Sequence, residues 1–312
     1  MRRTHAQLEE AYMKVAAIVV TYNRCELLKK TLSALEAQEY PVEKILVIDN
    51  ASTDDTQEML RARRNTAPIT VHQLRHNTGG AGGFFFGMDV AFQGDFDAFW
   101  IMDDDTVPRP AALAKLVEAM EEAATYRSDG MPSYAASMVK WTDGEFCNMN
   151  VPTLKWDGVK PLAHGKKWLD LDCASFVSCL VTREAVTECG LPKPEYFIWF
   201  DDAEYTYRLA KWRAGIFVPE SVADHLMPAN DPVSWNLATA DNFWKFGRGA
   251  RNQASAARSL RKPRILVDLV FGMYAQLKGS GMPYSLRLKL MGKVVQGLFR
   301  RVPVRYPRSL NH

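Results

Sequence analysis

The chain has 312 residues, enough for one large domain or for one domain with an appendage. Hydrophobic residues make up 47% and charged residues 24%, the ordinary balance of a folded soluble protein. The cysteine count, five, is odd and includes no CxxC pair, which disfavours a disulfide framework and favours a reduced setting. No apolar stretch approaches the roughly 18 residues that span a bilayer, so the sequence predicts no membrane-spanning helix.

The net charge of +3 hides an asymmetry between the two parts of the chain. From Arg258 to the end there are twelve Lys and Arg and a single acidic residue, Asp268. The preceding part is therefore acidic and the tail strongly basic. Such a division predicts that the tail faces something anionic, either a membrane or a nucleic acid.

The first 105 residues alternate between apolar runs that end in polar clusters and segments with helical spacing of leucines. This alternation predicts an α/β fold with a doubly wound, mostly parallel sheet, whose ligands lie at the carboxyl ends of the strands. The expected strands are 15–24, 43–52, 69–77 and 96–105, and the expected helices are 25–40, 53–64 and 84–92.

Beyond residue 105 the periodicity weakens. A helix is expected over 110–123, strands over 134–139 and 175–182, and a segment over 196–215 that begins extended and becomes helical. A final short strand is expected over 216–225. We therefore expect a catalytic domain at 13–228 and a helical, basic C-terminal region at 229–312.

The sequence "YSLRLKLMGKVVQGLFRR" predicts an amphipathic helix within that C-terminal region. Its apolar positions share one face, and its basic positions fall mostly on the other. Two interpretations remain open: a helix lying in a membrane interface, or a helix packed on the catalytic domain with a solvated basic face. The apolar positions are Leu290, Met291, Val294, Val295 and Leu298.

Three adjacent carboxylates, Asp103, Asp104 and Asp105, end the apolar run "AFWIMD". Their mutual repulsion makes a solvated turn possible, but a hard divalent cation bridging a diphosphate would neutralise them. Alternate strand residues point to the same side, so Asp103 and Asp105 are expected to share one focus.

Two other segments lie at the same predicted sheet edge. Asp49 and Asn50 end the second strand, where a carboxylate can accept hydrogen bonds from a nucleoside, although such residues are also common in turns. The stretch "HNTGGAGGF" predicts a loop that allows close backbone approach to a phosphate or a sugar. It lacks the GxGxxG and GxxxxGK[ST] spacings, which disfavours dinucleotide and Walker-type sites.

A second acidic cluster, "WFDDAE", supplies Asp201, Asp202 and Glu204 beneath aromatic residues. Burial beside other carboxylates raises the pKa of a carboxylate and suits a general base, whereas an acidic helix N-terminus would need no catalysis. His225, at the end of the last strand, is either a cation ligand or a structural histidine.

Together these segments resemble the inverting nucleotide-sugar glycosyltransferases of family 2, which have the fold type called GT-A. "VVTYNR" resembles the first-strand motif of the family, "VIDNASTDDT" its nucleoside-binding turn, "IMDDDTVP" its DxD metal motif, and "FIWFDDAEYTYRL" its acidic catalytic motif. "NTGGAGGF", the triple aspartate and "ADH" are similar to bacterial galactofuranosyltransferases, although Phe200 stands where those enzymes usually have Trp.

The resemblance implies a role for each candidate residue. Asp103, Asp105 and His225 would hold Mn²⁺ or Mg²⁺, Asp202 would be the base, Asp201 and Glu204 would orient the acceptor, and Trp199 would contact it. The nucleotide sugar would be held by Thr21, Tyr22, Arg24, Asp49, Asn50, Asn77, Gly79, Gly80, Gly82, Gly83, Asp103 and Asp104.

The implied reaction is metal-dependent transfer of a sugar, in particular galactofuranose from UDP-galactofuranose, to a glycan or polyprenyl-diphosphate-linked acceptor in cell-envelope polysaccharide synthesis. The basic tail would hold such an enzyme at the inner face of the cytoplasmic membrane. Alternatives are a rhamnosyltransferase using dTDP-rhamnose and a nucleotide-sugar-binding protein without activity. A nucleic-acid-binding function is disfavoured because the apolar residues of the tail line a helix face.

Overall fold

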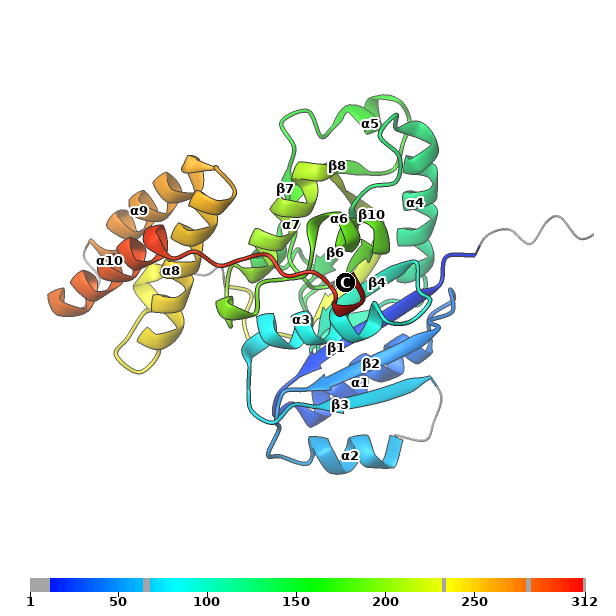
Figure 1. Cartoon of the computed structure of the whole chain (residues 1–312), viewed down its shortest axis with the longest axis horizontal. Helices are drawn as coiled ribbons and strands as arrows, with labels where there is room; N and C mark the ends of the chain where they lie inside the picture. Colours follow the sequence, from blue (N-terminus) through cyan, green and yellow to red (C-terminus); the bar gives the residue numbers. More distant parts are fainter. Residues whose placement is uncertain (1–11, 64–67, 232–233, 279–281, 311–312) are drawn as a thin grey trace, which may run out of the picture.

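A computed structural model describes residues 12–63, 68–231, 234–278 and 282–310. Its centre is a ten-stranded sheet with the strand order β3-β2-β1-β4-β9-β6-β10-β8-β7, and β5 pairs with β10 outside this sequence (Figure 1). The strands are β1 (Val15–Thr21), β2 (Lys44–Asp49), β3 (Ile69–Gln73), β4 (Ala98–Asp103), β5 (Thr106–Pro108), β6 (Tyr134–Lys140), β7 (Thr153–Leu154), β8 (Leu169–Cys173), β9 (Cys179–Thr182) and β10 (Gly215–His225).

Helices cover the sheet and extend beyond it at the C-terminal end of the chain (Figure 1). They are α1 (Cys25–Glu36), α2 (Thr56–Arg63), α3 (Gly79–Ala91), α4 (Ala112–Tyr126), α5 (Lys160–Ala163), α6 (Arg183–Cys189), α7 (Asp201–Trp212), α8 (Phe243–Ser259), α9 (Pro263–Leu277) and α10 (Tyr284–Phe299). Among the described helices, none is both long enough and apolar enough to cross a bilayer.

The expected doubly wound, mostly parallel sheet is confirmed. Strands β3, β2, β1, β4, β6 and β10 run in one direction, and β9 is inserted antiparallel between β4 and β6. The parallel strands therefore present their carboxyl ends at one edge, where ligands of such sheets bind. The antiparallel strands β7 and β8, which the weak periodicity of residues 141–174 did not predict, extend the sheet on the far side of β10.

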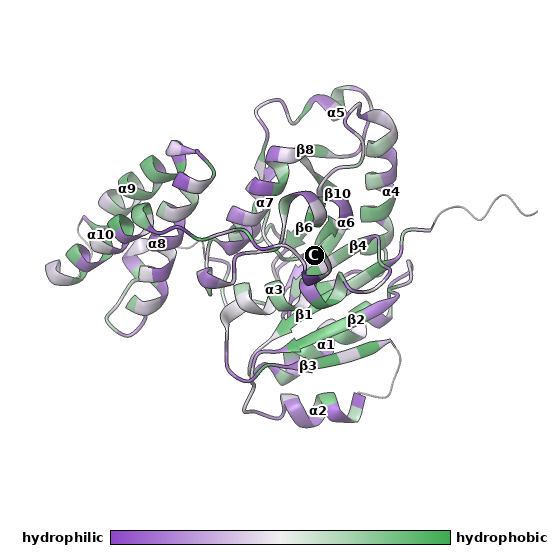
Figure 2. Ribbon diagram, in the orientation of Figure 1, coloured by the Kyte–Doolittle hydropathy of each residue, from purple (hydrophilic) through white to green (hydrophobic). Residues whose placement is uncertain are grey.

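The sheet is buried on both faces because its central strands are apolar without interruption. All residues of β1 are buried, and they alternate between two hydrophobic clusters, with Val15, Ala17 and Val19 in one and Ala16 and Ile18 in the other. Figure 2 shows these hydrophobic strands at the centre and polar residues on the outer faces of the helices.

The glycine-rich segment is not the loop that the sequence predicted, because Gly79, Gly80, Gly82 and Gly83 form the first turns of α3. Gly79 has a φ of +73°, and a Cβ there would lie 2.0 Å from the carbonyl oxygen of Phe197. A Cβ on Gly83 would lie 2.5 Å from the side chain of Val20. These glycines therefore let the helix pack closely on β1 and on the segment before α7.

The C-terminal region has its own hydrophobic cluster, formed by α8, α9 and α10, but it is also tied to the catalytic part. After α10 the chain returns across the molecule, where Arg308 pairs with Asp89 at 2.6 Å and the Leu191 amide donates to the carbonyl of Arg305 at 2.8 Å (Figure 1). The last described residues of the C-terminal region thus pack against the catalytic part of the chain.

Candidate active site

The candidate site lies at the carboxyl edge of the sheet, where the ends of β1, β2, β4 and β10 meet. Parallel pairing places Thr21 opposite Asp49 and Val20 opposite Asp103. The short strand β5 follows the aspartate triplet and pairs antiparallel with β10, setting Thr106 opposite His225. Residues that are distant in sequence are therefore brought together by strand register alone.

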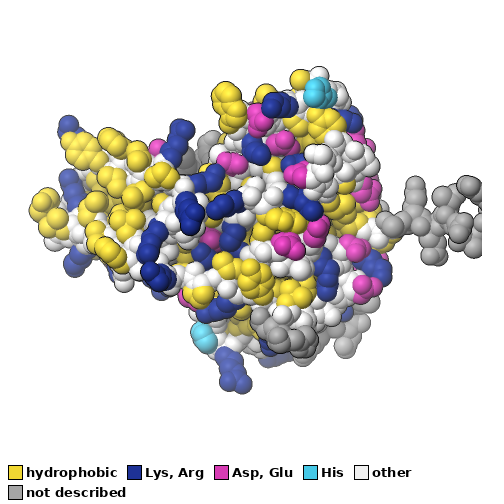
Figure 3. Space-filling model, turned by 45° about the horizontal axis from the view of Figure 1, so that its top comes forward, with side chains coloured by type: hydrophobic (Ala, Val, Ile, Leu, Met, Phe, Trp, Pro, Cys, Tyr) yellow, Lys and Arg dark blue, Asp and Glu magenta, His cyan; other side chains and the backbone are white. Residues whose placement is uncertain are grey.

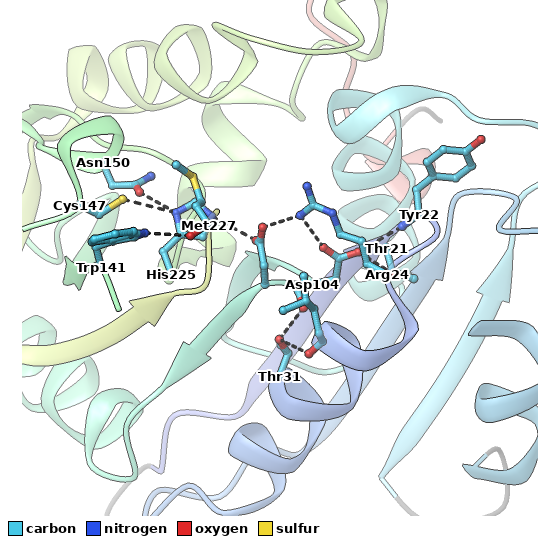
Figure 4. A network of polar contacts seen from close by, with 12 residues as sticks. Thr21, Tyr22, Arg24, Thr31, Asp104, Trp141, Cys147, Asn150, His225 and Met227 are labelled. Carbon is cyan, nitrogen blue, oxygen red and sulfur yellow. Dashed lines mark hydrogen bonds and ion pairs between the residues drawn. The ribbon is translucent and has the colours of Figure 1, made fainter. Parts of the chain in front are cut away.

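Asp104 is almost fully buried and anchors the triplet to the end of β1 (Figure 4). Its carboxylate accepts hydrogen bonds from the Thr21 hydroxyl at 2.7 Å and from the Tyr22 amide at 3.2 Å. The Arg24 guanidinium pairs with Asp104 at 3.2 Å and also with Asp105. Arg24, which the sequence suggested as a nucleoside ligand, partly neutralises the triplet in this structure. Asp104 and Asp105 therefore share Arg24 as a partner, and Asp103 does not pair with it.

The three carboxylates are electrostatically unequal. Burial and the neighbouring charges of Asp105 and Asp104 raise the pKa of Asp103 to about 7, and burial raises the pKa of Asp104 to about 6 despite its partners. Burial also acts on Asp105, but its hydrogen bond to His225 and the charges of His225 and Arg24 keep its pKa below the usual value. Within the described residues, the Asp103 carboxylate has no hydrogen-bond or ion-pair partner. The charges of His225 and Arg24 act on Asp103 only in part, because they do not offset its burial and the repulsion by its two neighbours.

His225 is oriented from its other side by Asn150. The imidazole Nε2 lies 3.1 Å from Asp105 Oδ1, and Nδ1 lies 2.8 Å from Asn150 Oδ1, with Cys147 Sγ also near (Figure 4). An amide oxygen can only accept, so Nδ1 must carry a proton. Burial lowers the pKa of His225, but the bonds to Asp105 and Cys147 and nearby carboxylates raise it to about 10. Asn150, which sequence reasoning missed, therefore leaves Nε2 as the atom that faces the carboxylates.

The chemistry of this donor set fits a divalent cation. No group of three or more His, Cys, Asp or Glu side chains in the described residues is already arranged around one point. The 3.1 Å between His225 Nε2 and Asp105 Oδ1 nevertheless matches the roughly 3 Å separation of neighbouring ligands on an octahedral ion with bonds of about 2.1 Å. Asp103 adds a buried carboxylate whose proton a cation would replace.

The second acidic cluster begins α7, next to the triplet. Asp201 and Asp202 occupy the first turn, where the helix dipole favours negative charge. Burial raises the pKa of both, and the pKa of Asp201 is raised further by Asp202 and by the charge of Asp103. The two acidic clusters therefore lie close enough for their charges to interact.

Glu204 differs from the other two acids of α7. It is 1% exposed and forms ion pairs with Lys193 at 2.9 Å and with Arg208 at 3.1 Å, so its pKa is lowered despite burial. Arg208 also donates to the carbonyls of Cys189 and Leu191. This placement favours a role in holding the start of α7 over contact with an acceptor.

The backbone immediately before Asp201 is strained. Phe197, Trp199 and Phe200 have φ values of 66°, 64° and 67°, a region that residues with a side chain adopt at a cost of about 1–3 kcal/mol each. This conformation turns the chain sharply into α7. The carbonyls of this segment must therefore be held by residues from elsewhere in the fold.

Asn252 of α8 holds this strained segment. Its side-chain amide donates to the carbonyls of Tyr196 at 2.9 Å, Ile198 at 3.1 Å and Trp199 at 2.9 Å, and the residue is fully buried. Arg251 donates to Asn252 Oδ1 at 3.1 Å, which fixes the orientation of the amide. The sequence offered no signal for Asn252, because it lies in a helix far from every recognised motif.

The candidate nucleoside residues lie at the ends of β1 and β2 and at the start of α3. Asp49 accepts a hydrogen bond from the Ser52 amide at 2.9 Å and so shapes the turn before α2, whereas Asn50 donates to the Gly79 carbonyl at 2.8 Å and so shapes the start of α3. The Asn77 side chain accepts a hydrogen bond from the Gly79 amide at 2.8 Å. Tyr22 is 43% exposed and is available to a ligand. Trp199 packs edge-on against Phe246 of α8.

Comparison with known proteins identifies a glycosyltransferase domain in the N-terminal half of the chain. Residues 16–155 match the model of glycosyl transferase family 2. The galactofuranosyltransferase GlfT1 of Mycolicibacterium smegmatis is 29% identical over 215 residues, covering 63% of this chain and 65% of the relative. GlfT1 of Mycobacterium tuberculosis is 27% identical over 213 residues, covering 63% and 64%. The chain thus spans just under two thirds of the length of these relatives.

Solved structures share the fold at low sequence identity. TarS of Staphylococcus aureus is 15% identical with a TM-score of 0.58, covering 92% of this chain and 81% of that chain. The mannosyltransferase PcManGT of Pyrobaculum calidifontis, solved with GDP-Man and Mn²⁺, is 17% identical with a TM-score of 0.57, covering 93% and 88%. The expected GT-A type of fold is confirmed.

The role of Asn252 is testable without any substrate. Asn252→Ala removes the side-chain donor of three carbonyls, and among the described residues only that of Tyr196 keeps another donor, the Ile198 amide at 2.7 Å. We therefore expect the variant to lower the free energy of unfolding by about 2–4 kcal/mol. Hydrogen exchange measured by mass spectrometry should accelerate in residues 196–204. Gln253→Ala, on the next position of the same helix, is the matched control. Equal exchange in the two variants would contradict the role.

Proposed function

Since this chain carries a family 2 glycosyltransferase domain on a GT-A fold, we propose that it transfers a sugar from a nucleotide-sugar donor, with inversion, to a hydroxyl of a cell-envelope glycan. The observation that carries the proposal is the convergence of two acidic clusters. The Ala81 amide at the start of α3 donates to the Phe197 carbonyl before α7 at 3.2 Å, and the charge of Asp103 acts on Asp201. One cluster suits a cation and a diphosphate, and the other suits a base. A sugar held between them would be open to attack.

The donor would lie along the carboxyl edge of the sheet. Tyr22, with its exposed ring, and Asp49 would contact the nucleoside, and the start of α3 would face the sugar. Asp103, Asp105 and His225 would hold Mn²⁺ or Mg²⁺ against the diphosphate. Such an ion stabilises negative charge on a leaving phosphate. The His225 Nε2 proton would be lost on binding, while Asn150 keeps the proton on Nδ1.

Asp202 would act as the base that takes the proton from the attacking acceptor hydroxyl. Burial raises its pKa, which strengthens its affinity for that proton, and the Ala203 amide at 2.7 Å holds one of its oxygens. Asp201 would orient the acceptor, and Trp199 would border it. Glu204 would hold α7 through Lys193 and Arg208 rather than contact the acceptor.

UDP-galactofuranose is our proposed donor, supported by the similarity to two galactofuranosyltransferases. The acceptor would be a glycan, or a glycan carried on a polyprenyl diphosphate. A rhamnosyltransferase using dTDP-rhamnose is the alternative within the family.

The C-terminal helices would bind the inner face of the cytoplasmic membrane. Exposed apolar side chains on α9 and α10 include Phe271 at 69%, Tyr274 at 68%, Tyr284 at 72% and Phe299 at 79%. Figure 3 shows apolar side chains gathered over these helices, with Lys and Arg between them and the catalytic part. An apolar face beside basic side chains suits an anionic lipid surface. Leu290 and Val294 are instead buried in the hydrophobic cluster of α8, α9 and α10, so this part of the α10 face packs on the other C-terminal helices and would not contact lipid.

Donor specificity and metal dependence can be measured together. We expect donor hydrolysis with UDP-galactofuranose in Mn²⁺ to exceed that with UDP-galactopyranose, UDP-glucose and dTDP-rhamnose, and EDTA to abolish it. The reason is that the crowded carboxylates repel a diphosphate unless a cation lies between them. Preference for dTDP-rhamnose would favour the alternative, and undiminished hydrolysis in EDTA would contradict the metal role.

The role of Asp202 separates an enzyme from a non-catalytic binding protein. Asp202→Asn keeps the size of the side chain but removes the base, so turnover should fall by about 100- to 10,000-fold while the donor dissociation constant is unchanged. In the unaltered protein, activity should decline as pH falls through the raised pKa of Asp202, because the protonated acid cannot accept a proton. Full turnover by Asp202→Asn would refute its assignment as base.

Membrane binding can be tested with point variants, which preserve the contacts of residues 300–310 with the catalytic part. We expect Phe271→Ser combined with Phe299→Ser to weaken sedimentation with anionic liposomes by about tenfold or more, since each phenyl ring contributes about 1.5–3 kcal/mol when buried. UDP binding should persist. Tyr126→Ser, on α4, is the control (Figure 1). Undiminished sedimentation of the double variant would place the membrane contact elsewhere.

A further inference from the structure

A cluster of arginines lies between the catalytic segment and the apolar face of the C-terminal helices. Arg251 of α8 and Arg300, which follows α10, both donate to the carbonyl oxygen of Glu195, at 3.4 and 3.1 Å. Arg248, one turn before Arg251, has its guanidinium carbon 4.5 Å from the centre of the Phe197 ring. Three guanidiniums therefore surround the chain a few residues before Asp201.

The positive charge of this cluster is not balanced by the protein. In the part of the chain that the structure describes, Arg248, Arg251 and Arg300 form no ion pair with a carboxylate. The nearby acid, Glu195, pairs with Arg305. Burial and the charges of Arg300 and Arg248 lower the pKa of Arg251 to about 10, which shows that the three groups repel one another.

Some N–H donors of the cluster have no acceptor, although Arg251 and Arg300 donate to the Glu195 carbonyl. Arg248 makes no hydrogen bond within the described ranges, only contacts with the faces of Phe197 and Trp244, and Nη1 of Arg300 is buried without a partner. Repelling charges with free N–H groups cost free energy that an anion would recover. Guanidinium forks match phosphate oxygens in geometry as well as in charge.

The position of the cluster indicates which phosphate it suits. Lys245, Arg248 and Arg251 follow one another along α8 at three-residue spacing, and Lys245 is near enough to Arg24 for the two charges to interact. The row therefore starts beside the donor site and ends at Arg300, which follows the exposed Phe299. Figure 3 shows Lys and Arg side chains in a band between the catalytic part and the apolar helices.

We propose that Arg248, Arg251 and Arg300 bind the diphosphate of a lipid-linked acceptor, whose isoprenoid chain lies along the apolar face and whose sugar reaches Asp202. This proposal rests on the proposed function and adds the site that recognises the carrier of the acceptor. The cluster is separate from the donor site at Asp103–Asp105. It would select a diphosphate because several guanidinium groups can each donate two hydrogen bonds to the phosphate oxygens.

The test measures binding of farnesyl diphosphate, a short isoprenoid diphosphate, to the whole chain saturated with UDP and Mn²⁺. We expect Arg248→Gln to weaken binding about tenfold and Arg248→Gln with Arg300→Gln about a hundredfold, since one charged hydrogen bond contributes about one decade. Arg264→Gln, whose arginine is exposed on α9, is the matched control and should leave affinity unchanged. Farnesol should bind poorly to every form.

Other outcomes would overturn the proposal. If the variants bind farnesyl diphosphate normally but lose binding to phosphatidylglycerol vesicles, the arginines contact lipid headgroups instead. If farnesyl diphosphate is displaced by UDP in competition, it occupies the donor site. UDP binding is measured on the same proteins. If the unaltered chain does not bind UDP, the proposed function is wrong. If it binds UDP but the arginine variants bind farnesyl diphosphate normally, only the proposed role of the arginines is wrong.

Discussion

The structure depends on the crowding of buried carboxylates at one edge of a parallel sheet. Asp103, Asp104 and Asp105 end a buried strand, and Asp201 and Asp202 start a helix beside them. Repulsion and burial raise the pKa values of most of these acids, and Arg24 and His225 supply the positive charge that the protein itself provides. The proposed cation would relieve this repulsion and could hold a diphosphate.

The C-terminal helices contribute to this site as well as to a proposed membrane surface. Asn252 of α8 holds three carbonyls of the strained segment before Asp201, and Gly249 leaves room for Trp199, where a Cβ would lie 2.7 Å from the indole ring. The same helix carries Arg248 and Arg251. If these arginines bind the acceptor as proposed, acceptor binding and the positioning of the acidic motif would be linked through one helix.

Local motifs were sufficient for residues whose partners are set by strand register. The polar ends of β1, β2 and β4 had to meet once the alternation of strands and helices implied a parallel sheet, and His225 joined them at the end of β10. Motifs were misleading where packing decided the outcome. The glycines of "NTGGAGGF" predicted a loop that allows close backbone approach, yet they start α3, where β1 and Phe197 leave no space for side chains.

The sequence alone determined the α/β class, the sheet edge that carries the site and most of its acidic residues, because hydrophobic alternation and strand-end polarity are local properties. Only the tertiary structure decided the partners: Arg24 with the triplet, Glu204 with Lys193 and Arg208, Asn150 with His225, and Asn252 with the strained segment. These pairings depend on the packing of elements far apart in the chain. Hydrogen bonds and ion pairs form between neighbours in space, and spacing along the sequence does not encode that proximity.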